Sequence, residues 1–316
     1  MAAAKKTVTA KGKGKPSTRL TEHLILADFM HGLFGKKNSD EIQTLLRDVQ
    51  EGYDDEGKSY LFHALISWNG LDPRVRANLE TYDSRIRGYV DRINRHRDLP
   101  VTLTYFQHLG LLYTEIFLDR YFQSPQRFLD ELNEYAYDLI EKQNLPTDFL
   151  FNDNDLRKLA FWMATGSGKT LILHFNYLQF MHYNTGPHRI NLDNIILITP
   201  NESLTNQHLS ELAKSGIPGE AFQPRGGLFA PMVAPTVIQV IDINKLTEEK
   251  KGQGVSVDIA SFDTRNLVFV DEGHKGSGGT SWMDLRKKIA IDGFTFEYSA
   301  TFGQAVAAVG KKVGEN

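Results

Sequence analysis

Hydrophobic and polar positions divide the chain into two parts with different periods. From about residue 20 to residue 144, apolar side chains recur every three to four positions, which is the spacing of helices with one buried face. Leu79, Tyr82, Ile86 and Val90 form one such face. The pattern predicts four to six helices and no strand in this part of the chain.

After residue 147, short continuous apolar runs alternate with helical stretches. The runs occupy residues 158–162, 195–198, 237–240, 267–270 and 294–296. Strands that are apolar at every position are buried on both faces, which is typical of a parallel sheet covered by helices. We therefore predict an all-α helical domain over 19–147, followed by an α/β lobe with a mainly parallel sheet over 148–316.

Composition limits the class of protein. The chain has 316 residues, 41% of them hydrophobic and 24% charged, and this balance is ordinary for a globular protein of about two domains. It has no cysteine, which excludes disulfides and thiolate metal sites and fits a reducing cytoplasm. No apolar run has the length of a membrane span, and the N-terminus lacks an apolar signal core. We expect a cytoplasmic protein with no membrane partner.

The first 18 residues differ from the rest in charge. They contain five lysines and no acidic residue, whereas the whole chain has a formal net charge of −3. With few large apolar residues, this stretch is predicted to be a disordered basic tail. Two interpretations stay open, a solvated tail and an arm that touches nucleic acid.

A phosphate-binding loop lies between the first predicted strand and the helix after it. Residues 163–170 read Met-Ala-Thr-Gly-Ser-Gly-Lys-Thr. Glycines let the backbone curl so that its N–H groups point at phosphate oxygens, and a helix start adds positive potential. Lys169 would reach the β- and γ-phosphates, and the Thr170 hydroxyl would ligate Mg²⁺. The predicted nucleotide-binding residues of the loop are Thr165, Gly166, Ser167, Gly168, Lys169 and Thr170.

Two further segments follow predicted strands and carry chemistry. Asp271 and Glu272 come directly after the run 267–270, where an Asp can hold Mg²⁺ and a Glu can polarise an attacking water. That combination favours hydrolysis over transfer to a bound hydroxyl. Ser299 and Thr301 follow the next strand and could report the state of the nucleotide. His274 has no second histidine at metal-ligand spacing, so a zinc site has little support there.

A fourth segment, residues 199–207, also follows an apolar strand. Pro200 would end the strand, and Ser203 could cap the next helix. Hydroxyls and helix N–H groups in such a turn can contact a nucleic-acid phosphate, so Thr199, Pro200 and Ser203 are candidate nucleic-acid contacts. An ordinary strand-to-helix turn would have the same composition.

In this order, the four segments resemble motifs I, Ia, II and III of the first RecA-like motor lobe of superfamily-two DEAD/DEAH-box helicases. Residues 271–274 are a variant of the Asp-Glu-x-His box. The amino-acid sequence of residues 163–170 and 297–302 is most similar to that of the ATPase (res) subunits of type III restriction enzymes and related phage-defence helicases. The consensus loop begins with Gly, but Met, as at position 163 here, is common in these subunits.

The resemblance implies an ATP- and Mg²⁺-dependent motor that moves on DNA, with double-stranded DNA as the expected track. It implies that Lys169, Asp271, Glu272 and His274 are catalytic, with Asp271 and Thr170 on the metal, and that Ser299 and Thr301 couple hydrolysis to movement. Gln107 is a candidate for an adenine-binding glutamine, although a polar residue on a helix flank is an equal alternative. A methyltransferase subunit or another defence-system protein is the expected partner.

The family also uses a second RecA-like lobe that carries an arginine finger. The chain has only about a dozen residues after Phe302, so we expect one lobe and weak ATP hydrolysis. Two other interpretations remain compatible with the sequence. One is a stand-alone P-loop NTPase or kinase, for which no lid is visible. The other is a truncated, non-catalytic protein that binds a partner through its helices.

Overall fold

A computed structural model describes residues 24–143, 150–222, 235–247, 257–258, 262–271 and 288–300. Glu272, His274 and Thr301 lie outside these ranges. The first part of the chain is helical, as predicted, with α1 (Ile25–Leu33), α2 (Ser39–Leu46), α3 (Tyr60–Ile66), α4 (Pro73–Asn94), α5 (Tyr105–Gln123) and α6 (Pro125–Gln143). No helix in the described ranges is both long enough and apolar enough to cross a membrane.

The longer helices begin at side chains that cap their free N–H groups. Asp72 accepts hydrogen bonds from the backbone N–H groups of Arg74 and Val75, and Pro73 occupies the first helical position of α4. Thr104 and Gln107 form a reciprocal capping box at the start of α5. These caps fix where α4 and α5 start, and Gln107 is thereby held at the N-terminal end of α5.

The second part of the chain forms a parallel sheet with the order β1-β8-β7-β2-β4-β3. Its strands are β1 (Lys158–Trp162), β2 (Asn194–Thr199), β3 (Gly219–Ala221), β4 (Ile238–Asp242), β7 (Asn266–Asp271) and β8 (Phe294–Ser299). The sheet confirms the predicted α/β, RecA-like fold class. All five predicted runs are strands, whereas the exposed edge strand β3 was not predicted. The short strands β5 (Leu246–Thr247) and β6 (Val257–Asp258) pair separately.

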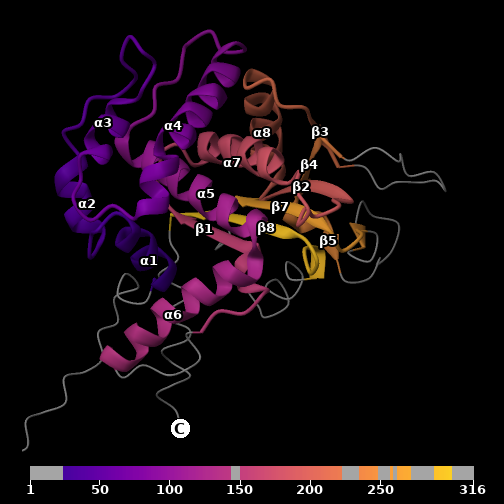
Figure 1. The fold of residues 1–316 in the computed structure, drawn as a ribbon. Coiled ribbons are helices and arrows are strands. Elements are labelled where there is room, and N and C mark those ends of the chain that lie inside the picture. The colour runs from indigo at the N-terminus through magenta and orange to yellow at the C-terminus, as the bar shows by residue number, and fades with distance from the viewer. Residues whose placement is uncertain are drawn as a thin grey trace, which may run out of the picture.

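Both faces of the central strands are apolar because side chains alternate across a sheet. On β2, Ile195 and Leu197 belong to the large core shared with the helices, and Ile196 and Ile198 belong to a smaller core on the opposite face. Helices α7 (Lys169–Tyr183) and α8 (Glu202–Lys214) contribute to the large core. In Figure 1, α4, α5, α7 and α8 gather on one side of the sheet, and α6 extends away from the body.

The helical part and the sheet are joined through α5 and α7. Apolar contacts dominate, such as that between the rings of Phe122 and Phe180, whose centroids are 5.5 Å apart. A buried polar group lies among them. The Glu115 carboxylate, fully buried, accepts hydrogen bonds from the Tyr183 hydroxyl at 2.6 Å and from Gln179 Nε2 at 2.8 Å. Burial raises the pKa of Glu115 to about 7, although these hydrogen bonds favour the ionised form.

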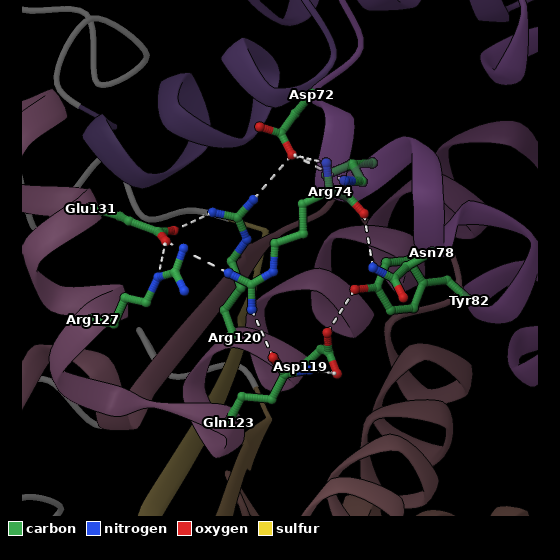
Figure 2. A network of polar contacts seen from close by, with 10 residues as sticks. Asp72, Arg74, Asn78, Tyr82, Asp119, Arg120, Gln123, Arg127 and Glu131 are labelled. Carbon is green, nitrogen blue, oxygen red and sulfur yellow. Dashed lines mark hydrogen bonds and ion pairs between the residues drawn. The ribbon is translucent and has the colours of Figure 1, made fainter.

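A second polar cluster joins α4, α5 and α6, and we call it the Arg120 network: Asp72, Arg74, Arg120, Arg127 and Glu131 (Figure 2). Arg120 is buried and bridges Glu131 on α6 and Asp72 at the start of α4, at 3.5 Å from the latter. The Glu131 carboxylate also forms ion pairs with Arg127 at 3.2 Å and with Arg74 at 3.6 Å. Ion pairs between these three arginines and two carboxylates therefore join the three helices.

Candidate nucleotide site

The strand order brings the predicted motifs to one edge of the sheet. The phosphate loop follows β1, Ser299 ends β8, Asp271 ends β7 and Thr199 ends β2, and these four strands are consecutive neighbours. The register pairs Trp162 with Ser299, Tyr298 with Asp271, and Ile198 with Val270. All four strands therefore end at the same level. We call this set of strand ends the carboxyl edge, where ligands of open parallel sheets bind.

The loop itself has a backbone that glycine makes possible. Gly166 and Gly168 have φ angles of 78° and 91°, in the left-handed region that other residues rarely adopt. Inside the turn, the Ala164 carbonyl accepts hydrogen bonds from the Ser167 N–H at 3.2 Å and from its hydroxyl at 2.6 Å. Helix α7 then begins at Lys169, with Gly168 as its N-cap. The first turn of α7 thus starts within the loop, as a phosphate cradle requires.

Two contacts tie the loop to the strand that ends at Ser299. The Met163 N–H donates to the Ser299 carbonyl at 3.0 Å, and the Trp162 indole Nε1 donates to the Ala300 carbonyl at 3.0 Å. Ser299 itself is buried. The segment predicted to report nucleotide state is therefore attached to the backbone that enters the loop.

Gln107 lies against the loop, although it is 60 residues away from Ser167 in the sequence. Its Nε2 donates to the Ser167 carbonyl at 2.9 Å, and its Oε1 accepts from the Thr104 N–H at 3.0 Å. A Cβ atom on Gly168 would lie only 2.6 Å from that Nε2. The amide thus holds the loop backbone on one side and caps α5 on the other. Its adenine contact stays a prediction.

Asp271 is held from the side of α8. Its Oδ2 lies 2.9 Å from Nε2 of His208, and both side chains are mostly buried. A carboxylate at this position and the Thr170 hydroxyl are both oxygen ligands, the type that Mg²⁺ prefers. The donor set of the edge therefore fits a magnesium ion bound with a nucleotide.

The segment after β2 is arranged differently from the prediction in one respect. The N-cap of α8 is Asn201, whose Oδ1 accepts from the Leu204 N–H at 3.0 Å, so the expectation that Ser203 caps the helix was wrong. Asn201 precedes the first helical residue and can take the extended backbone that a cap needs. The Thr199 hydroxyl is buried 2.6 Å from that of Thr205, whereas Ser203 is exposed.

The family of the chain follows from the sequence of its C-terminal part. The profile of the type III restriction enzyme res subunit matches residues 126–304, which is more than half of the chain and includes the whole carboxyl edge. The chain belongs to this family. A comparison with curated proteins gives no match.

Two solved structures resemble part of this res-family chain, both of Dbp5 from S. cerevisiae. One is a point variant bound to a variant of Gle1 and IP6, and the other is the same variant bound to RNA and ADP BeF3. Each is 17% identical, covers 51% of this chain and has a TM-score of 0.31, which supports no statement on function. The chain spans about 40% of the length of those proteins.

Three buried polar residues near the carboxyl edge of this res-family chain were not among the predicted site residues: Asn176, His208 and Tyr298. The Tyr298 hydroxyl donates to Asn176 Oδ1 at 2.7 Å, which joins β8 to the helix of the phosphate loop. Burial raises the pKa of Tyr298, and the negative charge of Asp271 raises it further. His208 shares an inner helical face with Thr205 and Leu212, and this spacing of three to four residues could have revealed it.

Proposed function

We propose that this chain is the ATP-binding lobe of a DNA-dependent helicase or translocase of restriction or phage-defence type. The observation that carries the proposal is the strand order at the carboxyl edge. It puts the phosphate loop, Ser299, Asp271 and Thr199 on four neighbouring parallel strands. Phosphoryl-transfer sites share these parts: a P-loop, the helix that begins in it, and a carboxylate at the end of a nearby strand, here β7.

The proposed roles follow from chemistry and position. Lys169 binds the β- and γ-phosphates, and the N–H groups from Thr165 to Thr170 surround them. Thr170 and Asp271 hold Mg²⁺, which when bound neutralises charge on the phosphate oxygens. Glu272 orients the attacking water. His274, Ser299 and Thr301 transmit the nucleotide state. The contact of Gln107 with Ser167 supports a role in shaping the loop beside the adenine-binding role predicted for it.

The track and partners are also proposals. We infer that double-stranded DNA is contacted at the start of α8, where Pro200 is partly exposed and Ser203 is exposed, and where the buried Thr199 hydroxyl lies 2.6 Å from that of Thr205. A methyltransferase subunit or another defence protein in the cytoplasm is the partner that the family suggests. A nucleotide in such motors lies between two lobes, and the carboxyl edge described here would form one wall of that cleft. We therefore expect hydrolysis to depend on an arginine finger that faces the edge from another lobe, since such a residue contributes on the order of 10³–10⁵ in rate.

Equilibrium titration with a fluorescent ATP analogue tests the proposal. We expect Mg²⁺-dependent binding that Lys169→Ala weakens by on the order of 100-fold, because the phosphate charge loses its cation in a partly buried site. Lys142→Ala is the matched control, since Lys142 is exposed on α6, 3.2 Å from Asp138. Equal affinity of the Lys169→Ala variant and the unmodified chain would refute the proposed site.

A turnover assay on residues 1–316 tests the need for a facing lobe separately. We expect ATP hydrolysis by this segment to rise when a second lobe of the same family is supplied. Turnover of several per second by the segment, unchanged by the second lobe, would contradict the proposal that the carboxyl edge is one wall of a two-lobe cleft.

A further inference from the structure

His208 lies outside the four motif segments, yet its imidazole contacts the Asp271 carboxylate directly. Its Nε2 lies 2.9 Å from Asp271 Oδ2. The His208 side chain is 3% exposed and that of Asp271 is 11% exposed. Beside a carboxylate, a neutral imidazole places its proton on the facing nitrogen, because the other tautomer would set a lone pair against the negative charge. Nε2–H therefore donates to Asp271, and Nδ1 finds no competing partner among the described residues.

Both elements that carry this contact are rigidly held. Asp271 ends β7, which lies inside the sheet between β2 and β8. The N-terminal half of α8 is fixed by the Asn201 cap and by the Thr205 hydroxyl, 2.6 Å from that of Thr199. A carboxylate that is held from two rigid elements keeps one rotamer, which is how outer residues orient metal ligands.

The C-terminal end of α8 is anchored to the helical part of the chain. Arg97, just beyond α4, donates from Nη2 to the Ser215 hydroxyl at 2.8 Å and lies 3.4 Å from Glu211. The Ser215 hydroxyl is also 2.9 Å from Nδ1 of His174, a buried histidine on α7. Helix α8 is therefore fastened on both sides of His208, and its histidine cannot drift from Asp271 without breaking these bonds.

We propose that His208 is a positioning residue that orients the Asp271 carboxylate for a divalent cation. The proposal rests on the proposed function, because Asp271 is a metal ligand only if the carboxyl edge binds a nucleotide with Mg²⁺. His208 touches neither the nucleotide nor the metal. It acts through Asp271. Its Nε2–H donates one hydrogen bond to Oδ2, which fixes the orientation of the carboxylate and leaves Oδ1 available as the ligand of the cation. Loss of such an outer partner typically weakens metal affinity 10- to 100-fold.

The test is a titration of MgCl₂ into the chain with a fluorescent ATP analogue, with a parallel titration of the analogue in EDTA. His208→Asn shortens the side chain so that it no longer reaches Asp271, whereas His208→Gln keeps a donor near the position of Nε2. We expect the Mg²⁺ concentration for half-saturation to rise about 10-fold or more for His208→Asn and to stay within about threefold of the unmodified chain for His208→Gln. Affinity in EDTA should be unchanged in both.

His174→Asn is the matched control, because His174 is buried in the same region and is not hydrogen-bonded to Asp271, and Asn keeps a polar atom near the position of Nδ1 that contacts Ser215. It should cost stability and leave half-saturation by Mg²⁺ unchanged. If His208→Asn does not fold, His208→Leu replaces it, since Leu fills the space without a donor. Equal half-saturation in the folded donor-free variant and the unmodified chain would overturn the proposal, and so would an equal loss of affinity in EDTA.

Failure of the proposed function has a different outcome. An unmodified chain that binds no nucleotide, or binds it without dependence on Mg²⁺ or Lys169, refutes the nucleotide site and with it the role of His208. A chain that binds nucleotide through Lys169 and Mg²⁺ but ignores His208→Asn refutes the role of His208 alone.

Discussion

The Arg120 network and the carboxyl edge are both rich in polar groups, but they are built in opposite ways. In the network, three arginines form ion pairs with two carboxylates, and these pairs join α4, α5 and α6. At the edge, the decisive features are strand ends and two glycines with positive φ, which prepare backbone N–H groups for a ligand. A high density of charge therefore marks a junction between helices here, whereas backbone geometry marks the candidate site.

The largest effect should come from breaking the Arg120 network. Arg120→Ala leaves Glu131 and Asp72 without their buried partner, which we expect to lower the free energy of unfolding by about 3–5 kcal/mol. Urea denaturation measures the loss. Nucleotide affinity of the folded variant should be unchanged, because the network lies among α4, α5 and α6 (Figure 2).

Arg127→Ala is the matched control for that prediction. Arg127 contacts the same Glu131 carboxylate at 3.2 Å, but its side chain is 72% exposed. An exposed pair of this kind contributes at most about 1 kcal/mol. Equal losses for Arg120→Ala and Arg127→Ala would show that burial does not set the strength of the network.

Glu115 is a third case, a carboxylate buried between α5 and α7. Burial raises its pKa to about 7 in the folded chain from an ordinary value of 4.5, so between these values the folded state holds a proton that the unfolded state has already lost. The contribution to stability is therefore greatest below about pH 4.5 and falls as the pH rises to about 7. We expect a fall of about 2–3 kcal/mol, which Glu115→Gln should remove.

Unfolding free energies measured by urea titration from pH 4.5 to pH 8 test this sign. Glu141→Gln is the control, because Glu141 is an exposed carboxylate on α6 and should leave the profile unchanged. A profile of the unmodified chain that rises over this range relative to that of Glu115→Gln would contradict the assignment.

Tyr298→Phe should have a smaller effect. It removes the hydroxyl that donates to Asn176 at 2.7 Å without changing the ring that packs in the core. We expect a loss of about 1–2 kcal/mol in unfolding free energy, because Asn176 Oδ1 loses a buried donor. Thermal unfolding measures it. A loss of nucleotide-binding free energy larger than the loss of unfolding free energy would show that Tyr298 belongs to the nucleotide site and does not only stabilise the fold.

The smallest effect is expected for Gln107→Ala. It deletes the hydrogen bond to the Ser167 carbonyl, which is worth about 1 kcal/mol, and should weaken binding of the ATP analogue about fivefold. Phe106→Ala, at the exposed neighbouring position, tests whether the effect belongs to the amide. If Gln107→Ala left affinity unchanged, Gln107 would be only a helix cap.

The sequence predicts the sheet well because its strands are continuous apolar runs. It predicts the loop because Gly166 and Gly168, directly before Lys169, allow the left-handed backbone that a phosphate-binding loop needs. It does not predict β3, since Gly219, Glu220 and Ala221 carry no apolar signal. The predicted N-cap of α8 lies two residues after the observed one, because Asn201 and Ser203 are both residues that favour this position. Glu115 escapes notice because one polar residue on a helix looks the same whether it is solvated or paired with another helix. The spacing of His208 from Thr205 and Leu212 indicates a buried face, but it does not identify Asp271 on a distant strand as the partner.

Hydrogen exchange with and without ATP and Mg²⁺ reports on both regions in one experiment. We expect the ligand to protect amides of residues 163–172 and of the strand ends at Asp271 and Ser299, and to leave those around Arg120 and Glu131 unchanged. Protection around the Arg120 network with none in the loop would contradict the assignment of the nucleotide site to the carboxyl edge.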